Sequence, residues 1–184
     1  MSKIRVCASV LAVVFLLWLQ PFSYSQINFG QIGQALLSGD PVSDSSGDLL
    51  FFKTMYSKSD GAQTEVILIS PSSGKATDQT YGGVLSPIKV GKQAIYALQS
   101  VPPSSGSKSA ATVSLVALVT PPLPSSLPSY SLTGGNFDFL KVARTESGVD
   151  YIYVLQMSSE GSSVLIFTFN GSTTFTLAYT VPLP

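Results

Sequence analysis

Any catalytic chemistry in this chain would have to rest on carboxylates, lysines, tyrosines and hydroxyls. The sequence contains no histidine, and Cys7 is its single cysteine. A serine or cysteine nucleophile activated by histidine is therefore excluded. Zinc, copper and iron sites built on histidine or cysteine are excluded for the same reason. We therefore expect no catalytic residue, no metal ligand and no cofactor.

Paired carboxylates, as used by glycoside hydrolases, are the catalytic arrangement that this composition leaves open. Most acidic residues stand beside Gly or Ser, where solvated turns are expected. Asp138 differs because it lies between two phenylalanines in an apolar run. Strand alternation places its side chain opposite both rings, either in solvent or lining a channel as a ligand-facing group. Asp40, Asp44 and Asp48 are spaced by four, which fits an Asx-rich loop and not a calcium loop.

Two segments of the chain repeat one another, IYALQ at residues 95–99 and IYVLQ at residues 152–156. A tyrosine and a glutamine thus recur at matching positions. Repeated glutamines line a shared channel or form the polar side of an alternating strand, and both readings stay open. The tyrosine rings offer flat apolar faces on which a sugar could stack. The candidate ligand-facing residues are Tyr96, Gln99, Asp138, Tyr153 and Gln156.

Asn170-Gly171-Ser172 is an N-glycosylation acceptor motif. The surrounding pattern puts it at the tip of a hairpin, where a glycan would be accessible. Asn-Gly also suits a plain tight turn with positive φ. Both interpretations remain open, and Asn170 is the candidate modification site.

The N-terminal segment has the pattern of a secretory signal. Two basic residues precede an apolar run over residues 6–19. The small residues Ser23 and Ser25 occupy the positions that a signal peptidase reads, so cleavage is expected before Gln26. A membrane anchor is the alternative, but a spanning helix needs roughly 20 apolar residues. We therefore predict secretion to the extracellular space.

After residue 48, short runs of β-branched and aromatic residues alternate with Gly, Pro, Ser and Asn turns, as in an all-β chain. The predicted strands are residues 49–56, 64–70, 76–81, 85–90, 94–101, 111–120, 129–132, 137–144, 151–157, 164–169 and 174–181. Residues 38–48 are predicted as loop, and the Pro-containing linkers 102–109 and 121–128 are expected outside the sheets. The chain thus divides into a signal peptide (1–25), a lead-in segment (26–47) and an all-β repeat domain (48–184).

The strands group into about three four-stranded antiparallel units. Residues 95–99 return 57 residues later, and LFFKT at residues 50–54 is a looser third copy 45 residues earlier. A four-stranded unit of roughly 40 to 50 residues is the period of a propeller blade, so propeller-like blades are predicted. A β-sandwich or an irregular barrel is the alternative. Three blades do not close a propeller, and the unpaired strand edges favour a homo-oligomer or closure by an end of the chain.

Residues 65–75 (EVILISPSSGK) and 86–98 (SPIKVGKQAIYAL) resemble a blade-to-blade passage of YVTN-type β-propeller repeats. The resemblance is strongest over residues 65–98. The resemblance implies a propeller-like arrangement and a binding function, because most proteins with such repeats bind other molecules. It carries no catalytic residue.

The composition also narrows the class of partner. Lys plus Arg and Asp plus Glu are both 10, so no basic excess exists to bind nucleic acid. No second long apolar run follows the leader, so no membrane span is expected after signal cleavage. These features predict a secreted, non-catalytic binding or structural module whose partner is an extracellular protein or glycan. A carbohydrate-binding, lectin-like protein and a carboxylate-dependent glycoside hydrolase are the alternatives.

Overall fold

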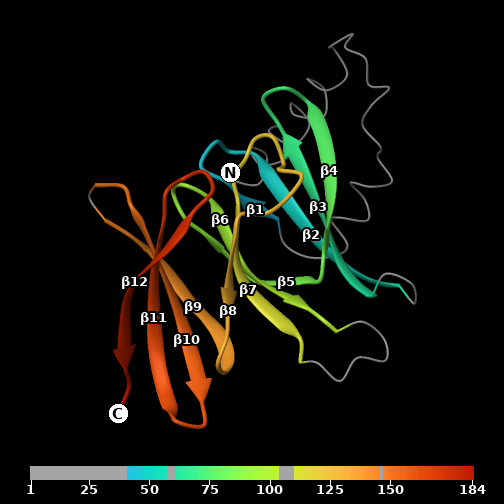
Figure 1. Ribbon diagram of the computed structural model, residues 1–184. Coiled ribbons are helices and arrows are strands. Elements are labelled where there is room, and N and C mark those ends of the chain that lie inside the picture. The colour runs from blue at the N-terminus through green and yellow to red at the C-terminus, as the bar shows by residue number, and fades with distance from the viewer. Residues whose placement is uncertain (1–40, 58–60, 104–109, 146) are drawn as a thin grey trace, which may run out of the picture.

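The computed structural model describes residues 41–57, 61–103, 110–145 and 147–184, and this part of the chain is built from strands (Figure 1). In chain order the strands are β1 (Val42–Ser43), β2 (Leu49–Ser57), β3 (Gly61–Ser70), β4 (Lys75–Gly82), β5 (Val84–Val90), β6 (Ile95–Val101), β7 (Thr112–Leu118), β8 (Ser129–Leu132), β9 (Asn136–Arg144), β10 (Asp150–Ser158), β11 (Gly161–Phe169) and β12 (Phe175–Pro182). The described residues contain no helix long and apolar enough to cross a membrane. The predicted all-β fold class is confirmed.

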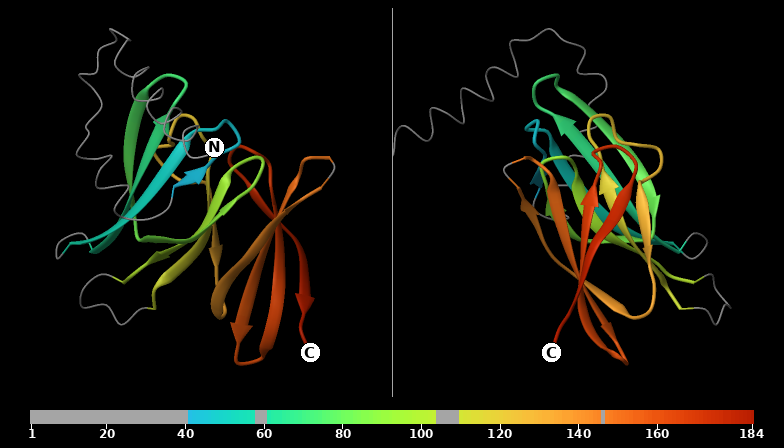
Figure 2. Two further views of the ribbon diagram at one scale, coloured as in Figure 1. Left: turned by 180° about the vertical axis from the view of Figure 1, so that it is seen from behind. Right: turned by 60° about the vertical axis from the view of Figure 1, so that its left-hand side comes forward.

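The strands form three four-stranded antiparallel sheets, each made of four consecutive strands. Sheet A contains β1 to β4, sheet B contains β5 to β8, and sheet C contains β9 to β12. The sheets follow one another in space as in the chain, with sheet B between the other two (Figures 1 and 2). This arrangement confirms the prediction of three four-stranded units and is consistent with propeller-like blades or a sandwich.

Every predicted strand is present, and the structure adds one. Residues 38–48 were expected to be loop, but β1 pairs Val42 with Leu50 and Ser43 with Leu49. This strand has only two residues, too few for alternation to be visible in the sequence. Residues 1–40, which include the predicted signal and most of the lead-in segment, lie outside the described residues.

Two apolar layers hold the three sheets together, and sheet B contributes to both of them. The layer between sheets A and B consists of Leu50, Val66, Leu68, Tyr81, Leu85, Ile95, Ala97, Val116 and Leu118. The layer between sheets B and C consists of Ala94, Tyr96, Leu98, Leu115, Ala117, Leu132, Phe139, Ile152, Val154, Leu165, Phe167, Phe169 and Phe175. Burying one large apolar side chain stabilises a fold by about 1.5–3 kcal/mol, so these layers supply most of the force that stacks the sheets.

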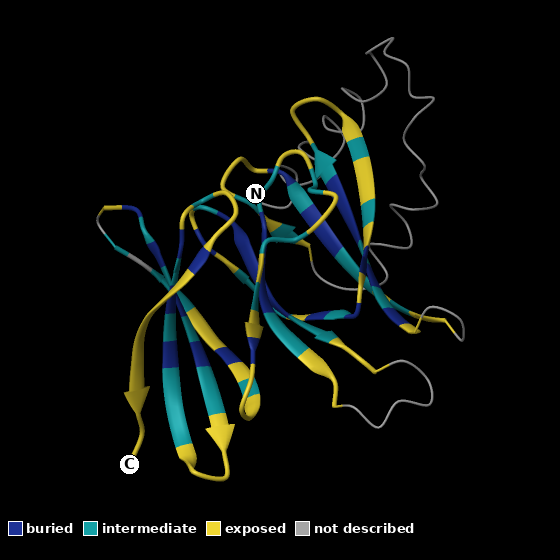
Figure 3. Cartoon of the chain, viewed as in Figure 1, coloured by how far each residue is buried: buried dark blue, intermediate teal, exposed yellow. Residues whose placement is uncertain are grey.

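The position of sheet B explains the unbroken apolar runs in its two central strands. Residues 95–98 in β6 and 115–118 in β7 are all buried, because consecutive side chains face opposite neighbours (Figure 3). A strand covered on both faces has no need of polar alternation. The unbroken apolar runs in β6 and β7 thus indicate that sheet B is the sheet covered on both faces.

The structure corrects the alignment of the third predicted copy. Ile95 and Ile152 each point toward the preceding sheet, as equivalent residues should. Leu50, which the sequence aligned with Ile95, instead points toward the following sheet. A one-residue slip moves every side chain to the opposite face, so residues 50–54 match the other copies only after a shift by one.

The connection from β7 to β8 runs outside the sheets, as predicted for residues 121–128. Leu123 and Leu127 pack against the layer between sheets A and B. The Tyr81 hydroxyl donates a hydrogen bond to the Pro124 carbonyl at 2.7 Å. Burial raises the pKa of Tyr81 to about 12, so the phenol remains a donor. Residues 104–109 of the other linker lie outside the described residues.

Candidate functional site

A buried carboxylate links sheet B to sheet C. Asp150 is the first residue of β10, and its residue is 0% exposed. One carboxylate oxygen accepts a hydrogen bond from the Lys92 backbone N–H at 3.0 Å. The other accepts from the Gln93 backbone N–H at 2.8 Å and from the Tyr96 hydroxyl at 3.0 Å. Asp150 therefore fixes the turn between β5 and β6 of sheet B against the start of β10.

Tyr96 was predicted to face a ligand, and this prediction is wrong. Its residue is 0% exposed, and its ring meets Phe169 and Phe175 edge-on at centroid distances of 5.9 and 6.2 Å. Burial raises the pKa of Tyr96 far above its ordinary value, and the charge of Asp150 and the hydrogen bond to it add to the effect. The hydroxyl thus stays protonated as a donor to Asp150, and the ring cannot stack on a sugar.

The repeated glutamines occupy equivalent structural positions. The Gln99 side chain donates to the Gly82 carbonyl at 2.6 Å, where the chain passes from sheet A to sheet B. The Gln156 side chain donates to the Thr133 and Gly134 carbonyls at 3.1 and 3.2 Å, where the chain passes from sheet B to sheet C. Both side-chain amides therefore bind the segment that connects one sheet to the next. Neither the predicted channel lining nor the predicted polar strand face included this role.

The first of these crossovers has a further, buried contact. Thr64 is 0% exposed, and its hydroxyl donates to the Gly83 carbonyl at 3.0 Å. The same hydroxyl accepts from the Leu85 backbone N–H at 3.1 Å. Gly83 has a φ of +80°, and a Cβ there would lie 2.5 Å from the Ser100 carbonyl oxygen. The A-to-B crossover is therefore closely packed, and the sequence did not single out Thr64.

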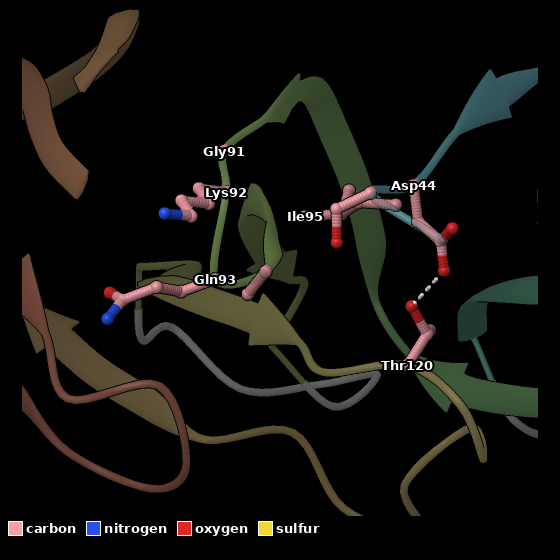
Figure 4. Close-up of a pocket in the computed structure, with 8 residues that line it drawn as sticks. Asp44, Gly91, Lys92, Gln93, Ile95 and Thr120 are labelled. Atoms are coloured by element: carbon pink, nitrogen blue, oxygen red, sulfur yellow. Dashed lines mark hydrogen bonds between the residues drawn. The ribbon is translucent and has the colours of Figure 1, made fainter. Parts of the chain in front are cut away.

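A small polar hollow lies where the turn before β2 meets the turn before β6 (Figure 4). The hollow is shallow and opens to solvent. It is lined by Asp44, Ser45, Gly91, Lys92, Gln93, Ala94, Ile95 and Thr120. Figure 4 shows the Lys92 and Gln93 side chains extending away from Asp44 and Thr120. The two long side chains are therefore not directed at the one carboxylate of the hollow.

Both carboxylate oxygens of Asp44 already accept hydrogen bonds from within the protein. One carboxylate oxygen accepts from the backbone N–H groups of Ser46 and Asp48 at 2.8 and 3.0 Å. The other accepts from the Thr120 hydroxyl at 2.6 Å. This is the Asx-rich loop that the sequence predicted. In the described part of the chain, no three acidic, histidine or cysteine residues gather as metal ligands would, and Asp40 lies outside that part.

Asp138 and Tyr153 lie on the face of sheet C that points away from sheet B. Phe139 is buried in the B–C layer, and Asp138 beside it is exposed, so the predicted alternation is confirmed. Tyr153 is half-buried, and the Lys141 ammonium lies 5.7 Å from its ring centroid. Asp150 points into the opposite face of the same sheet. Asp138 and Asp150 are therefore not a carboxylate pair.

Two cross-strand rows define this surface, which we call the outer face of sheet C. The first row is Lys141, Tyr153, Ile166 and Tyr179, and the second is Asp138, Leu155, Val164 and Val181. Each row starts with a charged residue on β9 and continues with apolar or aromatic residues across β10, β11 and β12. Tyr179 is 61% exposed and Val181 is 44% exposed. The sequence did not identify this face, because it depends on the pairing of four strands.

Asn170 forms the loop between β11 and β12. Its side-chain oxygen accepts from the backbone N–H groups of Ser172, Thr173 and Thr174 at 2.9 to 3.0 Å and from the Ser172 hydroxyl at 3.2 Å. Asn170 is exposed at this hairpin tip. The side-chain amide nitrogen, which a glycan would modify, is not the atom that organises the loop.

Comparisons of the chain with protein-family models, with curated proteins and with solved structures gave no match.

Proposed function

We propose that the protein is a secreted, non-catalytic binding or structural module that engages an extracellular partner through the outer face of sheet C. The observation that carries this proposal is a difference between two matching faces. Tyr96 and Leu98 in sheet B are 0% and 5% exposed because sheet C covers them. Tyr153 and Leu155 hold the matching positions in sheet C, and among the described residues no further sheet covers them (Figure 1).

The surroundings of these two residues support a contact surface. Exposed apolar residues that stand singly are ordinary on a protein surface, whereas a contiguous apolar patch indicates an interaction site. Here the apolar residues are contiguous across β10, β11 and β12. The polar residues that could have served a small ligand are instead bonded within the protein, as Gln99, Gln156 and Asp44 show. The chemistry of the outer face fits a partner with an apolar surface of its own.

We further propose that the three sheets are copies of one YVTN-type blade. The matched roles of Gln99 and Gln156 at successive crossovers support this, as does the matched direction of Ile95 and Ile152. In such a stack each blade presents one face to the blade before it and one to the blade after it. The outer face of sheet C is then the position that a following blade would cover.

A capture experiment with a matched control tests the proposed binding surface. The secreted chain, its Tyr179→Glu variant and its Tyr56→Glu variant are immobilised and exposed to the extracellular fraction of the native source. Tyr56 is 79% exposed but lies on sheet A, so its replacement controls for the loss of an exposed aromatic. We expect Tyr179→Glu to reduce retained partner at least about 5-fold, because a charge would be buried in an apolar contact. Retention that is independent of Tyr179, or no retention at all, would contradict the proposal.

Export and glycosylation are tested by expressing the full chain in a eukaryotic secretory host. We expect the product in the medium, with a mature N-terminus at Gln26. We also expect a mass decrease on treatment with an N-glycosidase, because Asn170 is exposed and its side-chain nitrogen takes part in none of the hydrogen bonds that organise the loop. Asn170→Gln should abolish that decrease. A product that is retained in the cell with Met1 attached would refute export.

A further inference from the structure

The charges on the outer face of sheet C are arranged in a self-complementary way. Lys141 begins one row on β9, and Asp138 begins the neighbouring row on the same strand. Both side chains are exposed. The remaining six positions of the two rows are apolar or aromatic. The outer face of sheet C therefore carries one positive and one negative group at its β9 edge, next to an apolar surface.

The stacking inside the molecule shows what kind of element covers such a face. The side of sheet B with Tyr96 and Leu98 is covered by a four-stranded sheet that contributes aromatic and branched residues. A partner of the outer face of sheet C that continued this stacking would be a sheet with an exposed apolar face. The interface would then extend an arrangement that the molecule already uses twice.

The other end of the stack does not offer such a face. On the outer side of sheet A, Phe51 and Ile67 form a small apolar cluster, and each is only 3% exposed. Head-to-tail association through sheets A and C would therefore find the apolar centre of sheet A already buried. Sheet C remains the element whose apolar outer face is accessible, and contact of one surface with itself is the rule in two-fold dimers.

We propose that the outer face of sheet C binds the same face of a second copy of this chain, about a two-fold axis that runs across the strands between the two rows. This inference rests on the proposed function, which assigns binding to that face. The axis places β9 over β9 of the other copy with the rows exchanged. Lys141 then faces Asp138 of the partner subunit, and the reverse pair forms as well. Tyr179 and Val181 lie in the apolar contact between the two β12 strands.

The size of the face sets the expected affinity. Four strands about 4.8 Å apart, with about five residues each at 3.3 Å, give a face of roughly 20 Å by 20 Å. Two such faces bury on the order of 1,000 Å², which is near the lower limit for a specific interface. We therefore expect a weak dimer with a dissociation constant on the order of 10 µM.

Sedimentation velocity of the purified secreted chain, from about 1 to about 200 µM, tests self-association. The wild-type chain should pass from monomer to dimer over this range. Tyr179→Glu and Val181→Lys should each raise the dissociation constant at least about 10-fold, because each would bury an unpaired charge. Tyr56→Glu should leave it unchanged. A wild-type chain that stays monomeric, or a dimer that persists in Tyr179→Glu, overturns the proposal.

Charge exchange tests the two-fold geometry. Lys141→Asp and Asp138→Lys should each raise the dissociation constant about 5-fold, because each places like charges opposite one another. The double variant should return to within about 2-fold of wild type. It cannot restore the contact of Lys141 with Tyr153 inside one copy, so that contact cannot be the source of the recovery. Absence of recovery overturns the geometry. A monomeric chain that still captures another protein through Tyr179 would overturn self-association and leave the proposed function standing.

Discussion

Replacement of Asp150 by alanine is expected to lower the free energy of unfolding by about 3 kcal/mol, which corresponds to a fall in melting temperature of roughly 10 °C. The reason is that three donors converge on one carboxylate that is 0% exposed. Two of them are backbone N–H groups in the turn between β5 and β6, so the variant would loosen the contact between sheets B and C. No apolar side chain in the B–C layer changes.

The magnitude follows from two opposing effects. Hydrogen bonds to a charged group contribute about 1.5–3 kcal/mol each, so three of them would suggest a larger loss. Burying the carboxylate, however, costs several kcal/mol, and the variant no longer carries that cost. What remains is the penalty for leaving Lys92 N–H, Gln93 N–H and the Tyr96 hydroxyl without an acceptor, at about 1 kcal/mol each.

Chemical denaturation of the Asp150→Ala variant, compared with a control variant at an exposed aspartate, measures this loss of stability. Asp78 is exposed on β4, and Asp78→Ala should change stability by no more than about 0.5 kcal/mol. Tyr96→Phe should cost about 1 kcal/mol in the wild-type background and much less after Asp150→Ala, because the two groups share one hydrogen bond. Equal denaturation midpoints for Asp150→Ala and Asp78→Ala would show that this buried network contributes no net stability.

The fold could be predicted from the sequence to the level of strands and sheets. Turn residues separate the strands clearly, and the apolar runs in β6 and β7 already mark a sheet covered on both sides. Two features required the structure. Strand β1 is too short to show alternation, and the run LLFF at residues 49–52 is apolar throughout. A run without polar positions does not show which side chains face which neighbouring sheet. The sequence alignment of residues 50–54 with the other two copies is therefore wrong by one residue.

The candidate site was less predictable, because the roles of its residues depend on the neighbouring sheet. The match of Tyr96 with Tyr153 is visible in the sequence, but whether a following sheet covers the ring is not. Tyr96 is buried for that reason, whereas Tyr153 remains partly exposed. Asp150 is one of the acidic residues for which nearby Gly and Ser residues predict a solvated turn. Its spacing of two from Ile152 and four from Val154 places all three on one face, and this signal could have predicted its burial.

The division of labour between polar and apolar groups connects the fold to the proposed function. Asp150, Thr64, Gln99 and Gln156 bond to backbone at the boundaries between sheets, so they determine how the sheets are placed. The apolar layers then supply the attraction. An outer face with the same apolar character and no covering sheet among the described residues is therefore where an interaction with another molecule is expected. This argues that binding by this protein extends its internal stacking.

Replacement of Gly91 by alanine is the second substitution with a large expected effect, a loss of about 3 kcal/mol of unfolding free energy. A Cβ at this position would overlap Oδ2 of Asp150 and would lie 2.5 Å from Cε2 of Tyr96. Neither neighbour can yield easily. The Asp150 oxygen is held by Gln93 N–H and the Tyr96 hydroxyl, and the Tyr96 ring is packed against Phe169 and Phe175. Relief therefore requires the turn to move away from sheet C and break the bonds to Asp150.

Gly82→Ala is the matched control, because a Cβ there meets nothing within 4 Å and its φ is not in the left-handed region. We expect it to change stability by less than about 1 kcal/mol. The sharper test is coupling: once Asp150→Ala has removed the main obstacle, Gly91→Ala should cost less than half of what it costs in the wild-type background. If denaturation shows the same cost in both backgrounds, the glycine is needed for the turn itself. Its close approach to the carboxylate would then not be the reason for its presence.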